Sequence, residues 1–248
     1  MTLLYDSIGR SYRNYRQPDP RIAAAIARAL GSAKSVVNVG AGAGSYEPRD
    51  RPVIAVEPSI EMVRQRAADA APVIRASAGE LPFRDRSFDT ALATLTVHHW
   101  PDRARGLREM RRVARRVVLY TWDPAVVTTG GFWLTDDYFP EIVELDRGLF
   151  PSVDEYRAAL GAVEVVRVPI PHDCTDGFLG AYWRRPHEYL DAGARGAIST
   201  FWKVADVERG LARLRRDLED GTWMRHHGHV MAWTELDLGY RLVIAVST

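Results

Sequence analysis

Three glycines alternate with alanines directly after an apolar run. The run Val36–Val39 is rich in valine and ends at Gly40, and Gly42 and Gly44 follow at every second position before Ser45. Glycine accepts positive φ angles and lets a ligand approach the backbone closely. The pattern predicts a buried strand that enters a tight turn, and such a turn is typical of a site for a nucleoside-containing cofactor.

An acidic residue follows the next apolar run, where such a cofactor would present its ribose. Val53–Val56 ends at Glu57, seventeen positions after Gly40. A carboxylate there accepts hydrogen bonds from the two ribose hydroxyls. The third glycine comes one position earlier than in the dinucleotide fingerprint G-x-G-x-x-G. The loop therefore suits an adenosine with an amino-acid tail, and an ordinary glycine-rich turn without a ligand is the alternative interpretation.

Histidines at two places have the chemistry of proton transfer or metal binding. His98 and His99 follow a predicted strand at 87–94, and an imidazole that ionises near neutrality suits a general base. We favour His98 as the base, and the alternative is that the pair only orients the loop. The cluster His226–His229 has no cysteine nearby, so we expect a loop or a substrate-pocket residue and no metal.

Alternating strands and helices position these residues. We predict helices at 19–31, 59–68 and 101–114, and strands at about 35–39, 53–57, 73–76, 87–94 and 116–120. This alternation is typical of a parallel sheet with helices on both faces, in which ligands bind beyond the carboxyl ends of the strands. Four segments follow such strand ends, so we expect them to meet at one edge: Gly40–Gly44, Glu57, Ser77–Glu80 and Thr94–His99.

The second half of the chain does not continue the regular alternation of strands and helices. We expect short helices at 136–146 and 152–160, a longer one at about 204–219, and strands at 163–169 and 239–246. If these two strands pair antiparallel at the sheet edge, the segment between them forms a lid over the ligand. Its aromatic residues either line an apolar substrate pocket or pack helices together; they are Phe132, Trp133, Tyr182, Trp183, Phe201 and Trp202.

Composition excludes several classes of protein. The chain has 248 residues with a net charge of +1, which suits one sizeable domain and gives no electrostatic case for nucleic acid or an anionic membrane. Its apolar runs fall short of the roughly 18 residues that span a bilayer. One cysteine, Cys174, allows no intrachain disulfide. The N-terminus lacks the pattern of a signal peptide, so we expect a cytoplasmic protein, and the oligomeric state is open.

Five ordered motifs resemble those of the class I S-adenosylmethionine-dependent methyltransferases, in particular the small-molecule group similar to the ubiquinone/menaquinone-biosynthesis enzymes. They are Gly40–Gly44, Val53–Met62, Ser77–Phe83, Ser87–Asp89 and Thr94–Trp100, within about residues 1–123. The sequence departs from the family pattern in two ways. Asn38 replaces an acidic residue, and we expect its amide to bond the glycine loop. The Pro-Gly-Gly turn before the fifth strand is missing, because Arg112–Val117 runs almost straight on.

The resemblance implies a fold and a cofactor. The fold is α/β, with a doubly wound, mostly parallel seven-stranded Rossmann-like sheet, an antiparallel edge strand and a helical lid insertion. The cofactor is S-adenosylmethionine, which leaves as S-adenosylhomocysteine after in-line methyl transfer to a small organic molecule. The catalytic candidates are His98 and His99, and we expect no metal site. The cofactor-binding candidates are Tyr5, Tyr12, Arg16, Gly40, Ala41, Gly42, Gly44, Glu57, Pro58, Met62, Ser77, Ala78, Gly79, Thr94 and Leu95.

The N-terminal tyrosines and Arg16 resemble a cover segment that meets the methionine end of the cofactor, or else they only dock the first helix. We expect a single domain over residues 1–248. Its cofactor-binding core spans 1–123, its substrate or lid region spans 124–235 with one edge strand at about 163–169, and a final edge strand lies at 236–248. The alternative functions are an NAD(P)-dependent oxidoreductase on a similar sheet, a regulatory cofactor-binding protein, and an enzyme that performs a non-methyl reaction.

Overall fold

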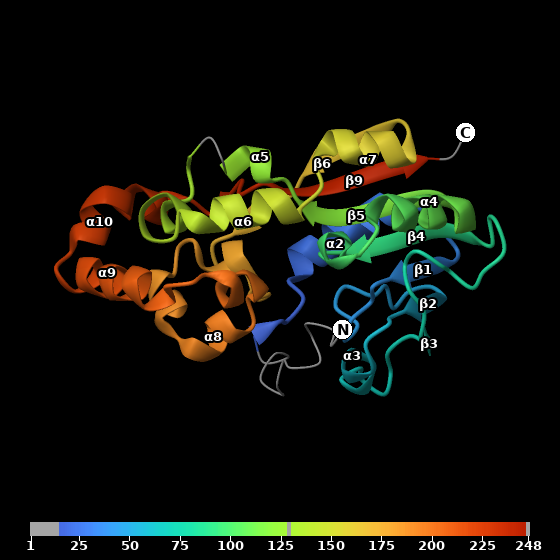
Figure 1. The fold of residues 1–248 in the computed structure, drawn as a ribbon, viewed down its shortest axis with the longest axis horizontal. Helices are drawn as coiled ribbons and strands as arrows, with labels where there is room; N and C mark the ends of the chain where they lie inside the picture. Colours follow the sequence, from blue (N-terminus) through green and yellow to red (C-terminus); the bar gives the residue numbers. More distant parts are fainter. Residues whose placement is uncertain (1–14, 128–129, 247–248) are drawn as a thin grey trace.

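The computed structural model describes residues 15–127 and 130–246, which build a seven-stranded sheet flanked by helices and a helical region beyond one end of that sheet (Figure 1). The strand order is β3-β2-β1-β4-β5-β9-β6. The strands are β1 (Val36–Val39), β2 (Val53–Val56), β3 (Val73–Ile74), β4 (Phe88–Thr94), β5 (Ala114–Trp122), β6 (Val163–Arg167) and β9 (Tyr240–Val246). The predicted seven-stranded, mostly parallel sheet is confirmed.

The last strand does not lie at the edge of the sheet, so the prediction of a final edge strand at 236–248 is wrong. Strand β9 pairs antiparallel with β5 on one side and with β6 on the other. All but the last residue of β9 are buried, and a strand that is apolar on both faces belongs inside a sheet. Strand β6 carries Glu164 and Arg167 and is largely exposed, which suits the edge position.

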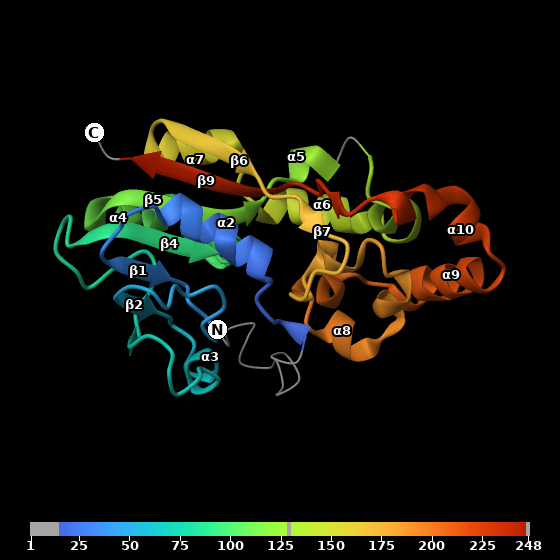
Figure 2. The same cartoon turned by 180° about the vertical axis from the view of Figure 1, so that it is seen from behind.

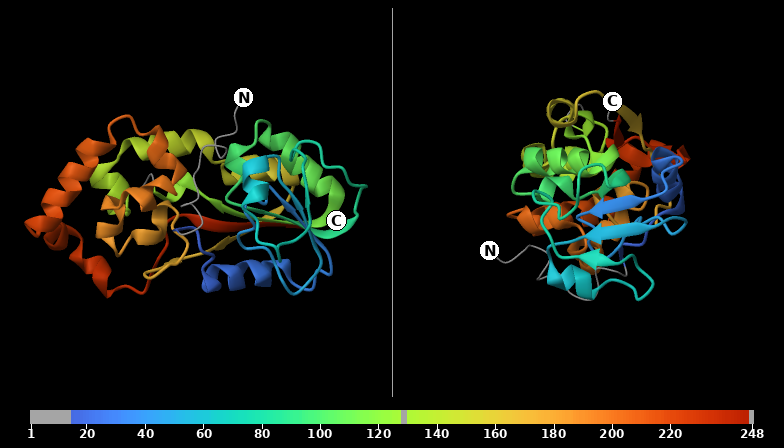
Figure 3. Two further views of the ribbon diagram at one scale, coloured as in Figure 1. Left: turned by 90° about the horizontal axis from the view of Figure 1, so that it is seen from below. Right: turned by 90° about the vertical axis from the view of Figure 1, so that its right-hand side faces the viewer.

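Helices cover both faces of the sheet (Figure 3). Helix α2 (Pro20–Leu30) packs its isoleucines on one face, and α4 (Arg103–Val113) and α7 (Val153–Leu160) cover the other. The predicted start and end of α2 are confirmed. The Asp19 side chain accepts a hydrogen bond from the Arg21 N–H, and Gly31 ends the helix at a φ of 57°.

The length of the helix after β2 and the connection between α4 and β5 were also predicted. Helix α3 (Ile60–Arg64) is shorter than the predicted helix at 59–68, because Gln65 ends it and the Arg66 side chain turns in beneath the glycine loop. Helix α4 passes into β5 without a turn, since Val113 ends the helix and Ala114 begins the strand. The straight passage that the sequence indicated is therefore present.

The helical region lies beyond the carboxyl ends of the parallel strands (Figures 1 and 2). Strands β7 (Ile170–Pro171) and β8 (Glu235–Leu236) form a small second sheet that joins it to the core. Its helices are α5 (Pro124–Val127), α6 (Glu141–Leu149), α8 (Ala192–Gly196), α9 (Val207–Glu219) and α10 (Thr222–His227), with short turns at η3 (Leu134–Tyr138), η4 (Leu179–Tyr182), η5 (Pro186–Leu190), η6 (Ser199–Lys203) and η7 (Gly228–Ala232).

The aromatic residues of this region mainly pack its helices together. The Trp133 ring centroid lies 5.3 Å from that of Trp223 and 5.6 Å from that of Tyr189, in edge-to-face contacts. Trp183 is fully buried, whereas Trp202 is 39% exposed. None of the six aromatics singled out in the sequence lines either cavity described below. Within the two described ranges, no helix is both long and apolar enough to cross a membrane.

Candidate functional site

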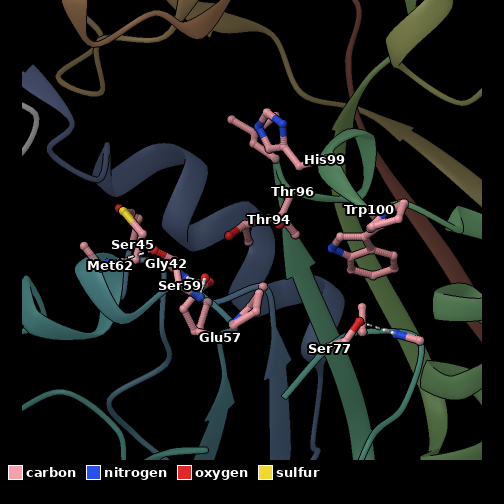
Figure 4. A pocket seen from close by; sticks show the side chains of 18 of the residues that line it. Gly42, Ser45, Glu57, Ser59, Met62, Ser77, Thr94, Thr96, His99 and Trp100 are labelled. Atoms are coloured by element: carbon pink, nitrogen blue, oxygen red, sulfur yellow. Dashed lines mark hydrogen bonds between the residues drawn. The ribbon is translucent and has the colours of Figure 1, made fainter. Parts of the chain in front are cut away.

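A cavity of about 490 Å³ lies at the carboxyl ends of β1, β2 and β4 (Figure 4). The four segments that follow strand ends meet there, as the sequence indicated. The predicted cofactor residues that line this cavity are Arg16, Gly40, Ala41, Gly42, Glu57, Pro58, Met62, Ser77, Ala78, Gly79, Thr94 and Leu95. Gly44 instead lines an open groove behind the loop. Tyr5 and Tyr12 lie outside the described residues.

Glu57 holds the glycine loop against the next strand connection. Its Oε2 accepts a hydrogen bond from the Gly42 N–H at 2.8 Å, and its Oε1 accepts one from the Ser59 N–H at 2.9 Å (Figure 4). The Ser59 side chain in turn accepts a hydrogen bond from the Met62 N–H, which begins α3. The carboxylate is thereby fixed at the cavity wall with its orientation set by two backbone donors.

Gly40 stands where only glycine fits. Its φ is +70°, and a Cβ placed there would lie 2.3 Å from the Thr96 Oγ1. We expect Gly40→Ala to cost about 2 kcal/mol of stability, from backbone strain and displacement of the threonine. Chemical denaturation measures it. Gly221→Ala is the matched control, since its φ is +77° and the nearest atom to its Cβ is a flexible arginine nitrogen at 3.4 Å. Equal losses at both positions would contradict the role of the threonine contact.

A buried ion pair supports the loop from below, and the sequence motifs gave no sign of it. The Arg66 Nη2 lies 2.7 Å from the Glu47 Oε1, and the Arg66 Nη1 donates to the Gly42 carbonyl at 3.2 Å. The Asn38 amide donates to the same glutamate at 3.2 Å. The expectation that Asn38 bonds the glycine loop itself is wrong, because the amide reaches Glu47 instead. An aspartate at position 38 would place a second carboxylate against Glu47, and like charges at this distance repel.

The two histidines after β4 separate into different cavities. Both lie on η2 (Val97–His99), and their ring centroids are 3.8 Å apart. His99 lines the 490 Å³ cavity, whereas His98 lines a smaller neighbouring cavity and stacks on Phe150 at 4.0 Å. The two rings are in contact, but of the pair His99 lines the larger cavity and His98 the smaller one. The choice of His98 as a base stays a prediction.

Burial keeps both imidazoles neutral at physiological pH. It lowers the pKa of His98 well below its usual value and the pKa of His99 to about 4, and the positive charges of Lys203 and Arg16 act in the same direction. We therefore expect the ring signals of both histidines in ¹H–¹³C NMR spectra to stay constant between about pH 8 and 5.5. Titration of either ring within this range, assigned with His98→Gln and His99→Gln, would contradict the burial that the structure shows.

Trp100 forms a wall of the larger cavity, although the sequence did not predict it as a site residue. Its side chain faces the loop of Ser77 in Figure 4. The indole packs against the backbone of Gly106, where an added Cβ would lie 2.5 Å from the Trp100 Cε3. A glycine in the middle of an amphipathic helix was the one sequence signal that could have indicated this close packing.

The N-terminal segment joins the core to the helical region. The Arg16 Nε donates to the buried Asp176 carboxylate at 2.5 Å, while the guanidinium lines the larger cavity. The Tyr15 hydroxyl donates to Asp191, the N-cap of α8, at 2.9 Å. Tyr15 therefore fits the interpretation in which this segment only docks against the rest of the protein. The position of Arg16 is compatible with docking and with contact to the methionine end of a cofactor.

The second histidine cluster lies on α10 and η7, away from both cavities. The His227 Nε2 lies 2.7 Å from the Asp137 Oδ2, and its ring packs near Trp133 and Trp223. These contacts join α10 to η3. The expectation that no metal binds here stays a prediction.

Comparisons with known proteins identify the family of this chain. A family model described as a methyltransferase domain matches residues 37–118. The crystal structure of a putative methyltransferase from an antibiotic biosynthesis pathway of Anabaena variabilis ATCC 29413 is similar to this chain, with 33% identity and a TM-score of 0.85. The match covers 94% of this chain and 99% of that chain.

Two other relatives have lower coverage or identity. The uncharacterized methyltransferase YcgJ of Bacillus subtilis (strain 168) is 30% identical over 45% of this chain, and the match spans less than half of that curated relative, 44%. The geranyl diphosphate C-methyltransferase of Streptomyces coelicolor A3(2), solved with S-adenosyl-L-homocysteine, is 15% identical with a TM-score of 0.50, over 92% of this chain and 78% of that chain, and shares the fold. Because the Anabaena likeness spans nearly the whole of both chains, this chain belongs to the class I S-adenosylmethionine-dependent methyltransferases.

Proposed function

We propose that this chain binds S-adenosylmethionine in the 490 Å³ cavity and transfers its methyl group to a small organic molecule. The observation that carries the proposal is the Glu57 carboxylate, which two backbone donors fix at the cavity wall beside the glycine loop. The cavity lies within the roughly 300–1,000 Å³ of small-molecule sites. An adenosine with an amino-acid tail fits the residue types that line it.

Each part of the cofactor has a partner in this proposal. Glu57 accepts hydrogen bonds from the ribose hydroxyls, and the backbone of Gly40 and Gly42 lies close to the tail. Ala78 and Trp100 provide apolar surface for the purine. Arg16 is placed toward the carboxylate of the tail, with Asp176 holding its guanidinium.

Methyl transfer requires the protein mainly to position the acceptor and to exclude water. The sulfonium of the cofactor supplies an activated methyl group. The residues of this chain orient the acceptor in line with it and, where the acceptor carries a proton, remove that proton. His99 lines the cavity and is neutral, but burial lowers its pKa to about 4 and makes it a weak base, so we expect it to contribute more to positioning than to proton removal. His98 lines the neighbouring cavity. The balanced net charge favours a small-molecule acceptor over a nucleic acid.

Calorimetric titration tests this proposal. We expect micromolar binding of S-adenosylmethionine and of S-adenosylhomocysteine, and no binding of NADH. Absence of binding by both sulfur ligands, or a preference for NADH, would overturn the proposal and favour the oxidoreductase alternative. Incubation with radiolabelled methyl donor and a panel of small alcohols, amines and carbon acids then identifies the acceptor atom.

A further inference from the structure

A second, smaller cavity adjoins the first. Its volume is about 60 Å³, and two residues, Arg16 and Leu95, line both cavities. On one side it is lined by Trp122 on β5 and Tyr240 on β9, at the carboxyl ends of the parallel strands. On the other side it is lined by residues of α6 and η6. Under the function proposed above, this position places it next to the cofactor, on the side of the helical region.

Four aromatic side chains line the smaller cavity, together with aliphatic and polar residues. Trp122 and Phe150 meet edge to face at 5.2 Å between centroids, and Phe178 and Tyr240 meet at 4.5 Å. The Tyr240 hydroxyl accepts a hydrogen bond from the Gly180 N–H at 3.2 Å. Since one water fills about 10–15 Å³ of such a volume, a cavity of about 60 Å³ holds roughly four to six water-sized groups, which is comparable to one small ring. Its aromatic side chains offer apolar surface to such a ring.

One carboxylate in this cavity has too few partners for its burial. Asp146 on α6 is 2% exposed and lines the cavity. The Thr200 hydroxyl donates to its Oδ1 at 3.3 Å, and within the described residues no hydrogen bond reaches its Oδ2. No arginine, lysine or histidine nitrogen of those residues lies within 4.0 Å of it. A buried carboxylate left in this state is costly, so an unfilled acceptor position facing a cavity indicates a ligand.

We propose that the smaller cavity receives the methyl acceptor, and that Asp146 determines specificity by accepting a hydrogen bond from a neutral hydroxyl on a compact aromatic molecule. This inference rests on the proposed function. The aromatic side chains hold the ring, and the Asp146 Oδ2 supplies the acceptor for the hydroxyl. The hydroxyl satisfies the one carboxylate oxygen that the protein leaves open.

His98 stays neutral and does not neutralise Asp146. Burial is the main cause of its lowered pKa, and the positive charges of Lys203, Arg16 and Arg103 act in the same direction. A phenol-type hydroxyl is a neutral donor and adds no further charge to the cavity. Burial raises the pKa of Asp146 to about 7, and the groups that face it are Thr200 and Lys203 on η6, His98 on η2 and Tyr240 on β9. A carboxyl that ionises near neutrality is a strong acceptor at physiological pH.

Phenol and anisole, which differ by one hydrogen-bond donor, are the probes. Each is titrated by NMR into protein saturated with S-adenosylhomocysteine. We expect phenol to bind the wild type about fivefold or more tightly than anisole. This preference is lost in Asp146→Leu. Glu144→Gln is the matched control on the same helix, because Glu144 is 70% exposed and pairs only with Arg147 among the described residues; it keeps the preference.

Dependence on pH gives a second readout that does not need the leucine variant to fold. Below about pH 7 the carboxyl is protonated and accepts more weakly, so phenol affinity falls in the wild type. In Asp146→Asn it stays constant. A pH dependence that persists in Asp146→Asn would overturn the inference.

Binding of S-adenosylhomocysteine, measured first in each variant, separates the two proposals. Its absence in the wild type overturns the proposed function. Its presence, together with equal affinities for phenol and anisole or with no phenol binding at millimolar concentration, overturns the Asp146 inference alone.

Discussion

Replacing Glu57 with alanine is expected to weaken the binding of S-adenosylmethionine and S-adenosylhomocysteine by about 100-fold or more. The carboxylate provides two ribose hydrogen bonds in the proposed complex, and hydrogen bonds to charged groups contribute about 1.5–3 kcal/mol each. Since each 1.4 kcal/mol corresponds to about tenfold in affinity, losing both gives at least that factor. The variant also loses the acceptor for the Gly42 and Ser59 N–H groups, which loosens the loop itself.

Titration calorimetry at one pH measures this effect, with circular dichroism to show that the variant is folded. Glu61→Gln is the matched control, since Glu61 lies on α3 near the same loop but pairs with Arg64 at the surface. Glu57→Gln is expected to fall between the two, because an amide retains only one acceptor oxygen. Affinity within about threefold of the wild type in Glu57→Ala would remove the main support for the proposed cofactor site.

Replacing Asp146 with asparagine is expected to stabilise the protein at alkaline pH. Burial raises the pKa of this carboxyl from 3.8 to about 7, so the folded chain holds a proton that the unfolded chain has released between those two values. Stability therefore falls as the pH rises through this window. The full difference corresponds to about 4 kcal/mol above pH 7. Asparagine keeps the bond from Thr200 and carries no charge to bury.

Urea unfolding at about pH 4 and about pH 8 checks this prediction. The variant and the wild type are expected to have nearly equal unfolding free energies at the lower pH, and the variant to be more stable at the higher one. Glu144→Gln, an exposed substitution on the same helix, should follow the wild type at both. A variant that gains no stability at alkaline pH would show that the carboxylate is solvated or paired in solution.

The sequence alone determined the parts of this protein that depend on neighbours in the chain. The start of α2 follows from Asp19 and Pro20, and the turn after β1 follows from residues that accept positive φ. Glu57 is recognisable as a site residue because it directly follows an apolar run of strand length. Consecutive strand ends of a parallel sheet meet at one edge, so these local signals also indicated the 490 Å³ cavity.

Features that depend on contacts between distant segments become visible only in the folded chain. Strand β9 lies inside the sheet because its two faces are covered by helices from both halves of the chain. The lysine and histidine neighbours of Asp146 come from separate elements, and no spacing within α6 distinguishes this aspartate from a surface residue.

The same reason separates His98 from His99 and places Trp100 against Gly106. Local patterns record backbone conformation and the polarity of a segment. Which polar side chain becomes buried, and beside which cavity, is set by packing between elements that are far apart in the sequence.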